Sequence, residues 1–329
     1  MKAQNFAWGL FDSLAGPGIT FVTGVLLANV IAPSIFGQYA TILAIVATGN
    51  VISDFGFAAS LIRRKDITAK DLGTAFLSVM FLSGLLVFIL ILLADKISLM
   101  FFDDTFGSKY IRFASVAIIL NSLGWIHKAK FEIDLDFKRL TRISILSTLL
   151  ASIGAVILAL VTPSIEALIA LILIQPLARS SLLWYYSKWK PVLVFSRKSF
   201  FNLTNFGTKI FLSTLITQLY NSSVTVLLGI RYSMYDLGLY LKANELRNLP
   251  AQNFSSALRR VSLPILAKYQ DDVVVLKIKF LKLQRLGFFV GLFLMTLVAF
   301  SSEALISSFY GAQWIGMLPI VYLLLVASI

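Results

Sequence analysis

The polar residues with the clearest chemical potential interrupt one long and otherwise apolar segment, residues 238–266. They are Lys242, Asn244, Glu245, Arg247, Asn248, Gln252 and Asn253. A Lys or Arg at the centre of a membrane helix costs about 2.5–3.5 kcal/mol on insertion scales, so this segment is expected to face water or a partner instead of lipid. Fixed cations beside water can bind an anionic group such as a phosphate.

The two cations of this segment are expected to differ in what they bind. Lys242 and Glu245 are three residues apart, so they can pair on one face of a helix and neutralise each other. Arg247 then remains as the cation for a phosphate group, and an ion pair with an acid from elsewhere in the chain is the alternative. The candidate substrate-binding residues are Arg247, Lys242, Asn244, Glu245, Asn248, Gln252 and, from a separate apolar segment, Arg179.

Arg179 has an alternative role of its own, because a long cationic side chain near a helix end can extend to the lipid headgroups. Two acids in the first two apolar segments, Asp12 and Asp54, are candidates for binding a coupling proton or sodium ion. Their alternative role is to cap a helix or to form a salt bridge at the interface. His127 ends an apolar segment and is expected to be exposed at the interface.

The composition excludes several classes of chemistry. The chain has no cysteine and one histidine, which leaves no thiolate site and no histidine-based metal centre. No glycine-rich phosphate cradle is present, so neither a nucleotide nor any other cofactor is expected. The net charge of +13 is interpreted as basic loops at an anionic membrane surface, and nucleic acid is not an expected partner.

The elements that must position these residues are membrane helices. Hydrophobic residues make up 58% of the chain, charged residues 14%, and the mean hydropathy is +0.85. Runs of about 20 mostly apolar residues are long enough to span a bilayer. We predict an all-α integral membrane protein with ten spans, at residues 6–31, 39–62, 75–94, 110–126, 143–161, 165–186, 205–230, 238–266, 283–300 and 311–329.

The basic residues predict the orientation of these spans. Of the 29 Lys and Arg residues, 21 fall in alternate gaps between the apolar runs or in the parts of the runs that border those gaps. Cytoplasmic loops carry the excess of Lys and Arg, so the gaps rich in basic residues are predicted to be cytoplasmic, and the amino terminus with them. The longest gap on the opposite side, residues 95–109, is too short for the external catalytic loop that a membrane enzyme would need. The chain is therefore predicted not to be an enzyme.

An internal repeat predicts how the spans are grouped. Residues 25–39, VLLANVIAPSIFGQY, match residues 226–240, VLLGIRYSMYDLGLY, without a gap at an offset of 201. In both copies one predicted helix ends, the chain turns, and the next helix begins. We predict two parallel helical lobes, residues 1–195 with six helices and residues 196–329 with four. A second lobe equal to the first would need six helices, so it is predicted to be truncated.

Three longer segments resemble the Wzx-type polysaccharide flippases of the multidrug, oligosaccharidyl-lipid and polysaccharide exporter superfamily. They are FGQYATILAIVATGNVISDFGFAASLIRR at 36–64, DLDFKRL at 134–140 and LGLYLKANELRNLPAQNFSSALRRVSLPILAKYQDD at 237–272. The resemblance implies a bacterial inner-membrane protein that moves undecaprenyl-pyrophosphate-linked oligosaccharide repeat units to the periplasmic leaflet by alternating access.

The resemblance also implies a site and partners. The family uses a basic cavity between its lobes, and Arg247 and Lys242 match that requirement. The implied partners are the lipid-linked anionic oligosaccharide, membrane lipids and the polysaccharide polymerase machinery. A drug or cation antiporter of the same superfamily is the alternative function.

Overall fold

The structure is a computed structural model, and it describes residues 3–64, 66–102, 105–187, 189–267, 269 and 272–327. The side chains of residues 3–14, 249–261, 263–265 and 267 lie outside the description. The described residues are helical apart from their connections and contain no strand. The helices are α1 (Ala3–Ala28), α2 (Pro33–Asp54), α3 (Phe57–Arg63), α4 (Ala69–Phe102), α5 (Phe106–Ile133), α6 (Phe137–Val161), α7 (Ile165–Tyr186), α8 (Arg197–Arg231), α9 (Met234–Ala267), α10 (Val273–Leu305) and α11 (Leu318–Val326). A π-helical turn, η1 (Ile306–Tyr310), and a 3-10 helix, η2 (Ala312–Met317), connect the last two.

Six helical segments of the described chain are long and apolar enough to cross a membrane. They are α2, α4, α6, α7, α8 and the segment Val273–Tyr310. The chain is therefore a multi-pass, all-α membrane protein. The count of ten spans stays a prediction. Helix α9 falls outside the six because the polar residues that drew attention in the sequence lower its hydropathy.

One predicted span is not a single continuous helix. Residues 39–62 were expected to form one helix, but α2 ends at Asp54 and α3 begins at Phe57. Phe55 and Gly56 between them adopt left-handed backbone angles, with φ of 45° and 74°. A Cβ on Gly56 would lie 2.2 Å from the carbonyl oxygen of Gly207 in α8, so the glycine is needed for close contact as well as for its conformation. The break places Asp54 at a free helix end.

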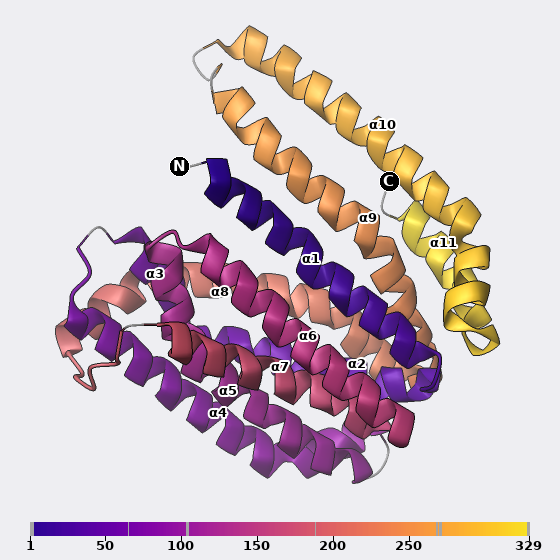
Figure 1. Ribbon diagram of the computed structural model, residues 1–329, viewed down its shortest axis with the longest axis horizontal. Helices are drawn as coiled ribbons and strands as arrows, with labels where there is room; N and C mark the ends of the chain where they lie inside the picture. The colour runs from indigo at the N-terminus through magenta and orange to yellow at the C-terminus, as the bar shows by residue number, and fades with distance from the viewer. Residues whose placement is uncertain are drawn as a thin grey trace.

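Helix α2 lies at the centre of the packing, in contact with α4, α5, α7, α8 and α9. Figure 1 shows α9 and α10 running side by side, with α1 next to α9. Helix α1 also packs along α6. One hydrophobic core joins α1, α2, α9 and the η1–η2 segment around Phe36, Tyr310 and Trp314. A second joins α2, α4, α5 and α7.

The two copies of the sequence repeat meet where α2 crosses α9. A Cβ on Gly37 would lie 1.9 Å from the carbonyl oxygen of Met234, and a Cβ on Gly238 would lie 1.8 Å from that of Pro33. At the offset of 201, Gly37 corresponds to Gly238 and Pro33 corresponds to Met234. Each contact is thus the counterpart of the other, which is the reciprocity expected around a local two-fold axis.

The expectation that His127 is exposed is wrong. Helix α5 continues to Ile133, beyond the predicted end at residue 126, and His127 is fully buried within it. The imidazole packs against Trp184 and Trp189, with ring centroids 4.5 Å and 5.6 Å away. Neither ring nitrogen has a hydrogen-bond partner in the described part of the chain. The residue therefore acts as an apolar space filler, a role that becomes visible only when α7 and its following linker are folded over α5.

We expect His127→Phe to unfold at the same temperature as the parent protein or a higher one. An aromatic ring without unsatisfied nitrogens keeps the contacts with both tryptophans and removes the cost of burying polar atoms without partners. His127→Ala should lose about 2–4 kcal/mol of stability, because it leaves a cavity between the rings. Thermal unfolding of the detergent-purified protein measures both, and equal destabilisation by the two substitutions would contradict this role.

Candidate functional site

The predicted pairing of Lys242 with Glu245 is confirmed. The Lys242 ammonium lies 2.7 Å from Glu245 Oε2, and its side chain is 2% exposed against 34% for Glu245. The ammonium also lies 4.3 Å from the centre of the Phe36 ring in α2. On α1, a Cβ at Gly24 would lie 2.8 Å from Lys242 Nζ. Lys242 is therefore held where α1, α2 and α9 meet, with its charge already balanced.

A double-mutant cycle should expose the asymmetry of this pair. Glu245→Gln leaves a buried ammonium without its counter-ion and should destabilise the protein by about 3–5 kcal/mol. Lys242→Met should cost less, because the carboxylate left behind is partly solvated. The double variant should be more stable than Glu245→Gln alone. Thermal unfolding of the four proteins gives the coupling, and strictly additive losses would argue against the pair.

Arg247 lies on α9 beyond this pair and is half-buried. Its Nη2 and Nε donate to Asn248 Oδ1 at 2.8 Å and 3.2 Å. Asn248 is a neutral partner, and no acid forms an ion pair with Arg247 among the side chains that are described. The guanidinium keeps its positive charge and further donors for a ligand. Asn244, which lies between Lys242 and Glu245 in the chain, is also half-buried.

Two other predicted residues cannot be placed. Gln252 and Asp12 lie in α9 and α1, but their side chains fall outside the described residues. The remaining two, Asp54 and Arg179, come together at a second location. They line one polar pocket of about 220 Å³ between α2, α4, α5 and α7. Their sequence separation gave no indication of this, because it depends on how the four helices pack.

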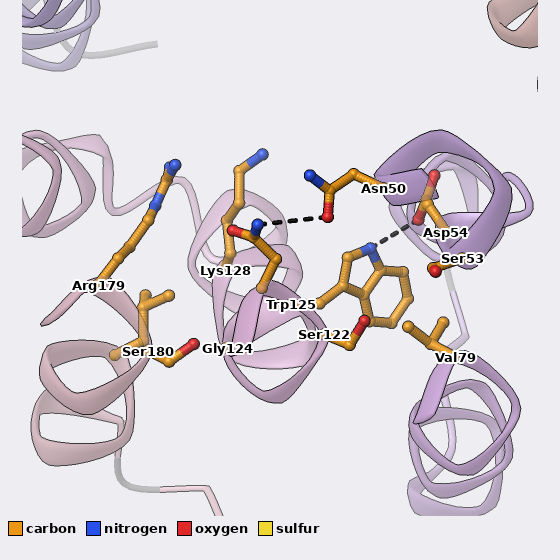
Figure 2. A pocket seen from close by; sticks show the side chains of 12 residues that line it. Asn50, Ser53, Asp54, Val79, Ser122, Gly124, Trp125, Lys128, Arg179 and Ser180 are labelled. Carbon is orange, nitrogen blue, oxygen red and sulfur yellow. Dashed lines mark hydrogen bonds between the residues drawn. The ribbon is translucent and has the colours of Figure 1, made fainter. Parts of the chain in front are cut away.

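Figure 2 shows the polar pocket, with Asp54 on the α2 side and Arg179 on the α7 side. Trp125 Nε1 donates to Asp54 Oδ1 at 2.6 Å, and Asn121 Nδ2 donates to Asn50 Oδ1 at 3.2 Å. The other lining residues are Ser53, Val79, Ser122, Gly124, Lys128, Ser180 and Leu183. The pocket thus combines amides, a carboxylate, hydroxyls, an indole and two cationic side chains.

Asp54 is held in the geometry of a helix-end acceptor. Besides the indole of Trp125, its Oδ1 accepts from the backbone N–H of Ala58 at 3.4 Å, across the break between α2 and α3. The capping role left open by the sequence is therefore present. The coupling role stays a prediction.

Sequence reasoning missed Asn50, Asn121 and Trp125 as members of a site. The signal that was available is the position of Asn50 and Asn121 inside long apolar segments, since polar side chains in membrane helices usually face the interior of the bundle. Nothing in the sequence paired them, because 71 residues separate one from the other. Lys128 falls in the gap after residue 126, which was predicted to be a cytoplasmic loop, but it lies in α5 and lines the pocket.

An apolar groove of about 660 Å³ lies between α1, α9, α10 and η1. Phe21 and Val25 of α1, on either side of Gly24, line it together with Leu246 of α9 and residues of α10 and η1. Leu246 directly precedes Arg247 in the chain. Apolar surface and a cation are therefore presented by neighbouring residues of the same helix.

Comparisons with known proteins give both a family and a fold. The family model described as "Polysaccharide biosynthesis protein" matches residues 26–319. The teichuronic acid biosynthesis protein TuaB of Bacillus subtilis (strain 168) is 27% identical over 286 residues, which cover 85% of this chain and 58% of that protein. The lipopolysaccharide biosynthesis protein WzxC of Escherichia coli (strain K12) is 24% identical over 324 residues, covering 98% of this chain and 66% of WzxC. The chain thus spans less than two thirds of the length of each of these relatives.

Among solved structures, the chain is similar to a multidrug resistance MATE family transporter of the MOP superfamily in its inward-facing conformation. The TM-score is 0.67 at 14% sequence identity, over 97% of this chain and 79% of the transporter. A MATE protein in its straight conformation gives a TM-score of 0.56 over 96% of this chain and 77% of that one. These likenesses show the fold.

Proposed function

Since the chain belongs to the polysaccharide biosynthesis protein family, we propose that it translocates a lipid-linked oligosaccharide across the bacterial inner membrane. The cargo is an undecaprenyl-pyrophosphate-linked repeat unit, moved from the cytoplasmic to the periplasmic leaflet. The single observation that carries the proposal is Arg247, a half-buried cation in a polar membrane helix whose described partner is the neutral Asn248. A pyrophosphate cannot cross hydrocarbon unless fixed cations and dipoles replace its hydration shell.

The polar residues of α9 are proposed to have two different roles. Arg247 binds the pyrophosphate, with Asn244, Asn248 and Gln252 as additional hydrogen-bonding groups. Lys242 and Glu245 fix α9 against α1 and α2, so that they act through the position of Arg247 and not through direct contact. Arg179, which lines the polar pocket, is proposed to bind the same substrate during transport. The apolar groove beside Leu246 receives the prenyl tail, which stays in an apolar environment during transport.

The proposed mechanism is alternating access between two lobes, residues 1–195 and 196–329. The reciprocal contacts of Gly37 and Gly238 support it, because they place equivalent parts of the two repeats on either side of one crossing. The amino terminus is proposed to be cytoplasmic, with ten spans in the chain. Asp12 and Asp54 are the proposed sites of ion coupling. The polysaccharide polymerase machinery is the proposed downstream partner.

The test is the fate of the glycan in cells that depend on this chain. Deleting it should leave lipid-linked repeat units in the cytoplasmic leaflet, where a membrane-impermeant lectin added to intact spheroplasts cannot reach them. Restoring the chain should make them accessible and recover surface polysaccharide. The competing function, a drug or cation antiporter of the same superfamily, predicts altered drug resistance with a normal glycan.

A further inference from the structure

The polar pocket has the chemistry of a carbohydrate site. Sugar hydroxyls each donate and accept, so they are best held by groups that do both, such as side-chain amides and hydroxyls together with a carboxylate. The pocket supplies Asn50 and Asn121 as amides, Ser53 and Ser122 as hydroxyls, and Asp54 as the carboxylate. Trp125 adds an aromatic surface in the same wall, as Figure 2 shows. Its amphipathic ring matches the alternation of C–H and O–H groups on a sugar.

The size of the pocket restricts the ligand. Sites for drug-sized molecules occupy about 300–1,000 Å³, whereas this pocket measures about 220 Å³. It can take one pyranose ring, and a whole repeat unit would have to extend beyond it.

A buried hydroxyl points to an open binding position. The side chain of Ser53 is 2% exposed and lines the pocket. Its Oγ has no hydrogen-bond partner in the portion of the chain that the structure describes. Buried hydroxyls in folded proteins nearly always have a partner, so rotation of the Ser53 side chain toward the pocket would let a ligand hydroxyl complete its hydrogen bonding.

The hydrogen bonds already present orient the wall of the pocket. Trp125 donates to one oxygen of Asp54, which leaves the carboxylate with further lone pairs to accept from a ligand. Asn121 donates to Asn50 Oδ1, which fixes both amide groups relative to each other. Such pre-arranged groups discriminate strongly between sugars, because a hydroxyl in the wrong position leaves buried polar groups unpaired.

From these contacts we infer that the pocket between α2, α4, α5 and α7 binds a single pyranose ring of the transported glycan through Asn50, Asn121, Asp54 and Ser53. This inference rests on the proposed function and deepens it. Arg247 and the neighbouring polar residues of α9 hold the pyrophosphate that all lipid-linked repeat units share, whereas the pocket recognises the sugar that differs among them. The residues that select the sugar thus lie in the first lobe, and the residues that bind the pyrophosphate lie in the second.

Calorimetric titration of the full chain in detergent, at constant sodium chloride, tests the inference. The probes are the methyl glycosides of glucose, galactose, mannose, N-acetylglucosamine and glucuronic acid. At least one should bind in the millimolar range, as expected for a small ligand held by a few hydrogen bonds. Asn121→Ala and Asp54→Asn should each weaken that binding about tenfold or more. The matched control Asn202→Ala, an exposed amide on α8, should leave it unchanged.

The outcomes separate this inference from the proposed function. If no glycoside binds, or if binding is equal in the parent and in folded Asn121→Ala and Asp54→Asn, the sugar site is wrong. Heat released by sodium chloride alone, and lost in Asp54→Asn, would assign Asp54 to the ion coupling proposed above and not to a sugar, and would overturn the inference. Arg247→Ala should keep glycoside binding. Glycoside binding in a protein that does not export glycan would contradict the proposed function but not the sugar site.

Discussion

Replacing Arg247 with alanine is expected to reduce glycan export at least about 30-fold in cells that depend on this chain. Among the α9 side chains that the structure describes, Arg247 is the cation without an acidic partner, and its hydrogen bonds run to the neutral Asn248. Removing one partner of a desolvated charge pair costs about 2–5 kcal/mol, and 2 kcal/mol corresponds to about a 30-fold change. Surface polysaccharide and the amount of lipid-linked repeat unit reaching the periplasmic leaflet measure the effect.

Two further variants serve as controls for the loss of charge and for the loss of an arginine elsewhere. Arg247→Lys keeps the charge but loses the planar set of donors, so export should fall by less than in the alanine variant. Arg231→Ala removes an exposed guanidinium from the end of α8 and should export normally. Normal export by a stable, membrane-inserted Arg247→Ala protein would remove the pyrophosphate site from α9.

Accessibility provides an independent check on the same residue. The chain contains no cysteine, so Arg247→Cys introduces a single thiol without any further engineering. A water-soluble thiol reagent should label it in at least one transport state. Complete protection under all conditions would mean that position 247 never faces water, and an anionic headgroup could not reach it.

The second large effect is expected at the crossing of α2 and α9. Gly37→Ala and Gly238→Ala should each destabilise the protein by about 3 kcal/mol or more, at the upper end of what overpacking costs. The added methyl would fall 1.9 Å from the carbonyl oxygen of Met234 in one variant and 1.8 Å from that of Pro33 in the other. These are backbone atoms, so the clash can be relieved only by moving the two helices apart. The midpoint of thermal unfolding measures the loss.

Glycines in open positions supply the control. A Cβ on Gly84 or Gly291 meets nothing within 4 Å, so alanine there should be neutral or stabilising by up to about 1 kcal/mol through helix propensity. The double variant Gly37→Ala/Gly238→Ala should lose less than the sum of the single losses, because the first substitution already separates the helices. If Gly37→Ala unfolds at the same temperature as Gly84→Ala, the close crossing is wrong.

Local rules were sufficient for part of the candidate site. The pairing of Lys242 with Glu245 could be predicted because helix geometry alone brings residues three apart onto one face. The sequence also showed that the polar residues of 238–266 are unsuited to contact with lipid. The matched glycines Gly37 and Gly238 were part of the repeat, but their role in packing was not apparent until the two copies were seen in contact.

Other features depended on residues that only folding brings together. His127 was expected at the surface because the sequence around it shows a helix end and a basic neighbour, whereas α5 continues and two tryptophans from beyond residue 180 cover the ring. The break at Phe55–Gly56 was missed because the apolar run continues through it. At the break, Gly56 lies in close contact with Gly207, which is on a helix far along the chain.

The order of amino acids was enough to predict a multi-pass helical membrane protein, one helix with polar residues unsuited to lipid, and an internal repeat. The length of an apolar run, its charge and its helical spacing are local properties, so they can be obtained from the sequence without knowledge of the fold. The shared pocket of Asp54, Arg179, Asn50 and Asn121, and the contact of the repeats at Gly37 and Gly238, became visible only in the folded chain. Those arrangements depend on which helices pack together, and no spacing along the chain specifies that.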